Sequence, residues 1–302
     1  MLYGFLKSTK PIHYLLTGVM LTAATVLFIL LRGYDAVEAA VGLFVVVLCL
    51  LVFQFVVAKN ELNARSAMSM WVLLWLLLAC MGHAIDVNAL AALLLLLLAL
   101  RRILSLNSGR DEIAKIFDAS FWISISCFVN PWYAALFLIV YMGVFLYARN
   151  QMRFWFIPFI AMICVGFLSF TIGYVFEIPM YRPWENSWAL LDLGIVEKGV
   201  DAFMFYLLLF LSIVFSCIYV VRTIDINKRV PKFLSVLITS VILGAALMVV
   251  NHTAPFSAAL LILPAIAIFI ARASYFMQHT GFRELLLWLP VVICAVNWLL
   301  YL

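Results

Sequence analysis

The stretch "FDASFWISISCFVNPWYAALFLIVYMGVFLYA" (117–148) decides how this chain folds. It contains two apolar runs, 117–129 and 132–148, and the pair Asn130-Pro131 separates them. Proline fixes φ and removes a backbone donor, and an Asn-Pro pair favours a turn. The two runs are therefore predicted to be two membrane helices joined by a short hairpin. The alternative is one long kinked segment, which would reverse the orientation of every later helix.

The rest of the chain is equally apolar. Of its 302 residues, 68% are hydrophobic and only 11% are charged, whereas a soluble domain is about half apolar and a quarter charged. This composition predicts an integral membrane protein. The six cysteines lie in apolar runs without a Cys-X-X-Cys pair, so we expect no disulfide framework and no metal site. The net charge of +5 comes from short basic clusters between apolar runs, so no nucleic-acid partner is expected.

Segments long enough to cross a bilayer can be counted directly, because a membrane helix needs about 20 mostly apolar residues. We predict an all-α, polytopic membrane protein of about eleven transmembrane helices, forming one membrane domain over 1–302 with no soluble domain. The predicted segments are 12–31, 37–58, 67–83, 87–105, 117–129, 132–148, 154–176, 202–221, 233–250, 254–272 and 284–301.

The basic residues predict the orientation. If the N-terminus is cytoplasmic, 16 of the 19 Lys and Arg residues fall in inner segments, and only Arg32, Arg182 and Lys198 fall outside. Cytoplasmic loops are the ones that hold Lys and Arg. The alternation continues on both sides of Asn130-Pro131, which favours the hairpin over the single kinked segment. We therefore expect a cytoplasmic N-terminus and an external C-terminus.

The longest polar stretch, 177–201, is predicted to be an external loop. Its Trp and Tyr residues favour the membrane interface. One interpretation is a flap that closes over a lipid-linked substrate, with Arg182 binding a phosphate and with Trp184 and Glu185 beside it. The other interpretation is an aromatic belt around an ordinary loop.

Asp35 and Glu38 lie at the external end of the first span. Their spacing of three places both carboxylates on one helical face. A pair of this kind suits a general base or a ligand for a divalent cation. The alternative is structural: Asp35 caps the second span and Glu38 lies in its first turn.

Three further polar residues lie at predicted helix ends. Asp86 and His252 are external and are candidates to contact a substrate, although solvated helix-end residues have the same pattern. They are too dispersed in sequence to predict a metal site. Asp118 begins the fifth span and is expected to be a cap or the partner of a nearby cation, for which Lys115 is available.

Three stretches resemble a family of Bacteroidota inner-membrane proteins that is catalogued as a domain of unknown function. They are "FLKSTKPIHYLL" (5–16), "VVAKNELNARSA" (56–67) and "LALRRILSLNSGRDEIAKIFDASFWISISCFVNPWYAALFLIVY" (98–141). The resemblance implies a bacterial inner-membrane location. With the orientation that the basic residues predict, the N-terminus lies in the cytoplasm and the C-terminus in the periplasm.

The chain also resembles the membrane module of C-type (GT-C) glycosyltransferases. The shared features are a basic inner loop, a short hairpin of the fifth and sixth spans, an Arg-bearing turn and a long seventh span. Those enzymes use a polyprenyl-phosphate sugar donor at the external face and place a catalytic acid after the first span, where Asp35 stands. The resemblance implies a membrane glycosyltransferase or a non-catalytic subunit of one. Unlike that superfamily, this chain has only a few residues between its first two spans.

Two other classes of function fit the same sequence. One is a transporter or lipid flippase, with an acidic external mouth that attracts cations or basic headgroups. The other is a structural subunit of a secretion or assembly complex, with other membrane subunits as partners. The sequence leaves open whether the protein is an enzyme.

Overall fold

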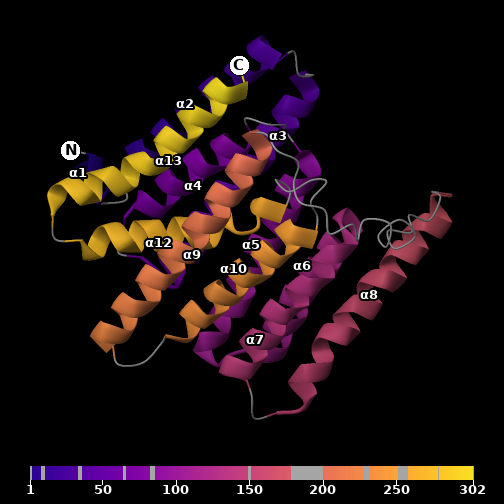
Figure 1. Cartoon of the computed structure of the whole chain (residues 1–302). Helices are drawn as coiled ribbons and strands as arrows, with labels where there is room; N and C mark the ends of the chain where they lie inside the picture. Colours follow the sequence, from indigo (N-terminus) through magenta and orange to yellow (C-terminus); the bar gives the residue numbers. More distant parts are fainter. Residues whose placement is uncertain are drawn as a thin grey trace.

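The computed structural model is helical throughout the part of the chain that it describes, which contains no strand. The helices form one bundle, with α8 at one edge and α2 at the other (Figure 1). The described residues are 2–7, 11–32, 36–63, 66–81, 86–148, 151–177, 200–227, 231–250, 258–277 and 279–301. The helices are α1 (Leu2–Leu6), α2 (Pro11–Arg32), α3 (Ala36–Lys59), α4 (Met68–Met81), α5 (Val87–Ser105), η1 (Leu106–Ser108), α6 (Glu112–Val129), η2 (Pro131–Leu136), α7 (Phe137–Tyr147), α8 (Arg153–Val175), α9 (Val200–Asn227), α10 (Lys232–Val250), α12 (Leu263–Phe276) and α13 (Thr280–Tyr301).

Each predicted apolar segment contains a helix, although three boundaries differ by five residues or more. The eighth segment was expected to end at 221, but α9 continues to Asn227. The fifth segment was expected to begin at 117, but α6 begins at Glu112, because one further amphipathic turn precedes the apolar run. The tenth was expected to begin at 254, but α12 begins at Leu263, with Pro264 in its first turn. Proline favours this position, where its missing N–H costs no helical hydrogen bond.

Several helices are suited to a membrane by length and composition. In the described part of the chain, five are long and apolar enough to cross one. This finding supports membrane insertion. The five are Val37–Lys59, Val87–Ser108, Arg153–Val175, Lys232–Val249 and Thr280–Leu300.

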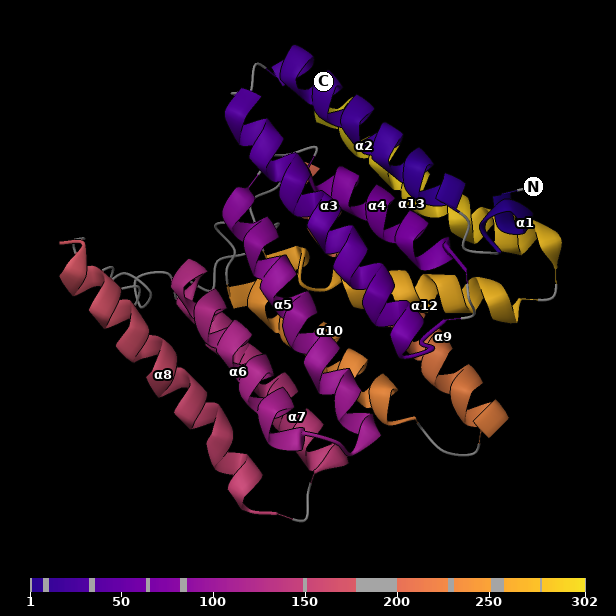
Figure 2. The ribbon, with the colours of Figure 1, turned by 180° about the vertical axis from the view of Figure 1, so that it is seen from behind.

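The turn predicted at Asn130-Pro131 is confirmed. α6 ends at Val129, and the Asn130 side-chain oxygen accepts a hydrogen bond from the Trp132 backbone N–H at 3.0 Å. The chain then returns through η2 and α7, so that the end of α7 lies beside the start of α6 (Figure 2). A side-chain cap followed by proline at the first helical position explains why the break falls here.

Two short helices, α4 and α12, form the centre of the bundle. All but one of the α4 side chains are buried, and α12 is buried along almost its whole length. The two helices pack against each other, and α12 runs across the direction of α5, α6 and α8 in both views (Figures 1 and 2). A helix that is apolar on every face can be enclosed in this way, because no polar face requires water.

A buried turn precedes α12. Residues 258–262 are all at most 5% exposed, and backbone bonds such as Leu261 N to Ala258 O (3.1 Å) and Ile262 N to Ala259 O (3.0 Å) hold the turn. A buried turn of this kind needs protein to cover it, because its backbone groups are kept from water. Gly244 of α10 provides that cover, because a Cβ built on it would lie 2.5 Å from Ile262 Cγ1.

Side chains of α13 satisfy the last carbonyls of α4. The Asn297 amide donates to the Ala79 carbonyl, and the Trp298 indole N–H donates to the Leu78 carbonyl at 3.1 Å. The last four carbonyls of a helix have no partner within the helix. These two bonds therefore fix the C-terminal end of α4 against α13 inside an apolar environment.

Candidate functional site

The described cavities lie at the end of the bundle that carries the basic residues. Lys59 and Arg101 lie 5.5 and 4.7 Å from the centroid of the Phe55 ring, which joins the ends of α3 and α5 there. Arg102 and Asp118 form an ion pair at 2.7 Å between α5 and α6. We call this side of the molecule the basic end.

The turn before α6 shapes the wall of the site. Gly109 and Asp111 both adopt left-handed backbone conformations, with φ of 64° and 50°, and so reverse the chain within a few residues. Lys115 then donates to the Ser105 carbonyl at 3.0 Å and to the Ser108 hydroxyl at 2.6 Å, which ties α6 back to the end of α5. The first turn of α6 therefore has a fixed position beside α7 and α8.

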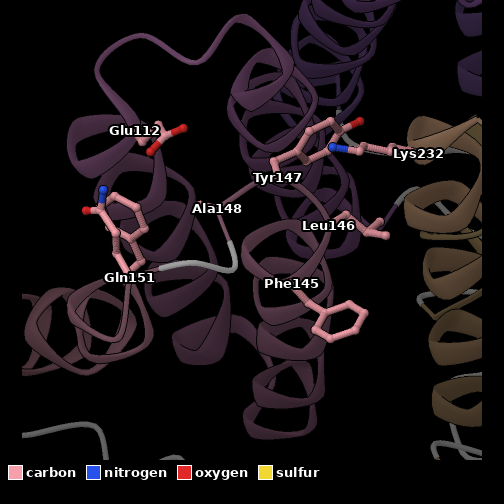
Figure 3. Close-up of a pocket in the computed structure, with 8 residues that line it drawn as sticks. Glu112, Phe145, Leu146, Tyr147, Ala148, Gln151 and Lys232 are labelled. Atoms are coloured by element: carbon pink, nitrogen blue, oxygen red, sulfur yellow. The ribbon is translucent and has the colours of Figure 1, made fainter.

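One cavity, with a volume of about 500 Å³, opens between the start of α6, the end of α7, the start of α8 and the start of α10. Figure 3 shows Glu112 on one side of it and Lys232 on the other. Its lining combines these two charges with amide, phenol and apolar groups. The lining residues are Glu112, Phe145, Leu146, Tyr147, Ala148, Gln151, Phe154 and Lys232.

A second cavity, of about 630 Å³, adjoins the first and shares Glu112 and Phe154 with it. It lies between the first turns of α6 and α8 and includes Asp111, Arg153 and Ile160. We call the two cavities together the basal cleft. Their volumes are in the range of small-molecule sites, about 300–1,000 Å³.

The charged groups in the basal cleft differ in how they are held. Lys232 lies 5.1 Å from the centroid of the Tyr147 ring. Arg153 donates to the Gln151 side-chain oxygen at 2.6 Å and lies 5.2 Å from the centroid of the Phe154 ring. Within the described part of the chain, neither cation has a carboxylate within 4.0 Å, and Glu112 has no cation at that distance. These groups are thus placed in the cleft without an ion-pair partner among the described residues.

The walls of the cleft connect with the outer surface of α8. Ile160 lines the second cavity and is 56% exposed, and Phe145 lines the first and is 48% exposed. Further along α8, Phe167 and Phe170 are 68% and 54% exposed. α8 is the outermost helix of the bundle beside α6 (Figures 1 and 2). An apolar path therefore leads from the surface of the bundle into a cleft that contains charges.

Most of the residues predicted from the sequence to form a site lie outside the described residues. That is true of five of the seven: Asp35, Arg182, Trp184, Glu185 and His252. The remaining two are both exposed.

The two described members of that set have helix-terminal positions. Glu38 lies in the first turn of α3. Asp86 caps α5, where its carboxylate accepts from the backbone N–H groups of Asn88 and Ala89 at 3.0 and 3.1 Å. Glu38 and Asp86 make no hydrogen bond or ion pair with each other. Asp86 is thus the N-cap of α5, a role that was not predicted for it from the sequence.

Asp118 pairs with a nearby cation, as predicted, but that cation is not Lys115. Lys115 is three residues away on the same helix, but it turns toward η1 and bonds Ser105 and Ser108 instead. Asp118 pairs with Arg102 of α5. A helix end with several cations offers more than one partner, and the packing of α5 on α6 selects among them.

Sequence reasoning missed the basal cleft because its cations were interpreted only as orientation signals. Glu112 was the available clue, since it is a carboxylate at the end of the bundle where basic residues predominate. Among the described residues, no group of three or more His, Cys, Asp or Glu residues could hold a metal ion.

Comparison with known proteins adds no family to this description. No protein-family model matches the chain, and no curated protein or solved structure is significantly similar to it.

Proposed function

We propose that this protein is a lipid-binding membrane protein that takes up the polar headgroup of a membrane lipid in the basal cleft. The observation that carries the proposal is the combination of Lys232, Glu112 and Gln151 with the exposed apolar residues Phe145 and Ile160 in one pair of adjoining cavities. Ligand sites typically combine mostly apolar walls with a few polar groups that fix orientation. A membrane lipid matches both kinds of lining, because it has apolar tails and a polar headgroup in one molecule.

The location of the cleft supports a ligand that arrives from the bilayer. Its charges lie at the basic end, where positive residues face the headgroup region of a membrane. Its apolar lining continues onto the outer face of α8, whose exposed side chains are suited to contact with lipid tails. A water-soluble ligand would gain nothing from that apolar path.

In the wider proposal, the chain crosses a bacterial inner membrane eleven times, with its N-terminus in the cytoplasm and its C-terminus in the periplasm. The basal cleft then opens to the cytoplasmic leaflet. The protein would present its lipid to partner subunits or move it toward the opposite face, as a lipid flippase does. The support is the 16-of-19 share of basic residues on inner segments.

Binding can be tested by native mass spectrometry of the purified full-length protein, titrated with a short-chain phospholipid. Lys232→Gln removes the charge in the cleft and should weaken binding about tenfold, as expected for one charge-assisted hydrogen bond. Lys59→Gln is the matched control, because Lys59 also lies over a ring at the basic end but outside the cleft. Equal affinities for the two variants would disprove the proposal.

A second candidate is the GT-C-like glycosyltransferase acting on a polyprenyl-phosphate-linked sugar, with Asp35 as its catalytic base. It is supported by Glu38, whose exposed carboxylate lies in the first turn of α3 directly after Asp35 in the chain. Asn retains the capping ability of Asp without its charge. Asp35→Asn should therefore abolish formation of a glycoconjugate that a deletion strain lacks, while protein level stays unchanged. If Asp35→Asn fully restores the glycoconjugate, Asp35 is only a helix cap and this candidate function is wrong.

A further inference from the structure

We propose that the basal cleft selects a zwitterionic phospholipid headgroup, one that carries a phosphate and an ammonium group. The inference rests on the proposed lipid-binding function and names its ligand class. It starts from the balance of charges that line the two cavities. Lys232 and Arg153 supply two positive charges, and Glu112 and Asp111 supply two negative ones. Asp118 also lines the second cavity, but Arg102 neutralises it at 2.7 Å.

The two signs are separated in space. Lys232 enters from the start of α10, and Glu112 from the start of α6, and Figure 3 shows them on opposite sides of the first cavity. They make no ion pair with each other or with any other described residue. A ligand with one charge of each sign can satisfy both groups, with its phosphate toward Lys232 and its ammonium toward Glu112.

Headgroups of a single sign fit this lining less well. An anionic headgroup beside Lys232 would share the cavity with the Glu112 carboxylate, and juxtaposed like charges are unfavourable. An uncharged headgroup would bury both charges without a partner, which is also costly. Gln151 offers its side-chain N–H groups as further donors to a phosphate, because its oxygen already accepts from Arg153.

Two adjacent charged groups, Lys115 and Asp118, have partners within the protein and do not change this balance. Lys115 is bonded to Ser105 and Ser108 and lines neither cavity. The selectivity of the cleft therefore depends chiefly on Glu112 for the ammonium and on Lys232 for the phosphate. The carboxylate distinguishes this cleft from a generally basic surface, which would prefer anionic lipids.

The test compares short-chain phosphatidylethanolamine with phosphatidylglycerol, which has the phosphate without the amine. Both are titrated into the full-length protein in mild detergent, with bound lipid counted by native mass spectrometry. The wild type should bind phosphatidylethanolamine about tenfold more tightly. Glu112→Gln should remove that preference, whereas Lys232→Gln should weaken both lipids. Glu61→Gln, an exposed carboxylate outside the cleft, should change neither.

Two failures can be distinguished. If both lipids bind in a manner that depends on Lys232 but with equal affinity, or if Glu112→Gln keeps the preference, the zwitterionic inference is wrong and lipid binding stands. If Lys232→Gln changes the affinity for neither lipid, the proposed function itself fails. Thermal unfolding of each variant in the same detergent checks that the fold is retained.

Discussion

The ammonium group of Lys232 lies 5.1 Å from the centroid of the Tyr147 ring, which joins the first residue of α10 to the last residue of α7. A cation over an aromatic face is attracted by the ring but keeps its N–H donors free for a ligand. No carboxylate from the described part of the chain competes for it. Lys232 is thus held at the edge of the basal cleft in a state ready to bind an anion.

The close approach of α10 to the turn before α12 predicts a cost for any side chain at Gly244. A Cβ there would lie 2.5 Å from Cγ1 of Ile262, which is 1% exposed and cannot move aside freely. Gly244→Ala should lower the free energy of unfolding by about 1–3 kcal/mol through overpacking. Gly166→Ala on α8 is the control, because no atom lies within 4 Å of its Cβ. It should be neutral or stabilising by up to about 1 kcal/mol.

These free energies can be measured by reversible denaturation in detergent micelles. Equal stability of the Gly244→Ala and Gly166→Ala proteins would mean that α10 does not approach Ile262 as closely as described.

The end of α3 predicts a stabilising substitution. Glu61 has φ of 50°, and the backbone bond from Leu62 N to Val57 O at 3.1 Å closes the helix around it. This left-handed position after a helix is normally glycine, since other residues pay steric strain there. Glu61→Gly should raise the unfolding free energy by about 1 kcal/mol. Glu61→Ala removes the same charge but retains the backbone strain. An equal rise in unfolding free energy in both proteins would show that the lost charge, and not the relieved strain, is the cause.

The bond from Asn297 to the Ala79 carbonyl predicts a loss on its removal. Asn297 is 0% exposed, so the carbonyl that it satisfies cannot turn to water. Asn297→Leu preserves volume approximately and removes the donor. It should cost about 1 kcal/mol, since hydrogen bonds between membrane helices average about 0.6 and reach about 1.7 kcal/mol. Asn88→Leu, on an exposed first turn, should cost less. If the Asn88→Leu protein is the less stable of the two, the Asn297 hydrogen bond does not stabilise the fold as predicted.

The share of the basic residues predicts which end of the molecule faces the cytoplasm. Cysteines placed at Asn227, the last residue of α9, and at Asn186 in the predicted external loop would be probed with a membrane-impermeant thiol reagent. The native cysteines are replaced first. In cells stripped of the outer membrane, position 186 should react and position 227 should be protected. Labelling of 227 alone would place the basal cleft on the outer face.

The sequence was sufficient for those parts of the fold that depend on local signals. Apolar runs located the helices, and Asn130-Pro131 located the hairpin, because capping and the missing proline donor act over a few residues. The burial of α4 and α12 could not be predicted in the same way. Helices that are apolar all round have no distinct face, so nothing local distinguishes a lipid-facing helix from a central one.

The candidate site was less predictable for a related reason. Lys232 and Arg153 carried an orientation signal that any membrane protein would show, and this obscured a second role. Glu112 and Lys232 are far apart in sequence and line one cavity only because the starts of α6 and α10 lie beside the end of α7. The approach of α7 to α5, where a Cβ on Gly143 would lie 2.6 Å from Ile103 Cγ2, contributes to that arrangement and is a long-range property.

The most direct test of the central claim is site-specific photo-crosslinking of lipid in the native membrane. Benzoylphenylalanine replaces Phe145, which lines the basal cleft, or Phe170, which is similarly exposed on α8 outside the cleft. After irradiation of cells, the captured lipids are identified by mass spectrometry. We predict that position 145 captures one headgroup class in excess of its share of the membrane and loses this excess with Lys232→Gln, while position 170 captures lipids in bulk proportion. Bulk proportions at both positions, unchanged by Lys232→Gln, would contradict a headgroup site in the basal cleft.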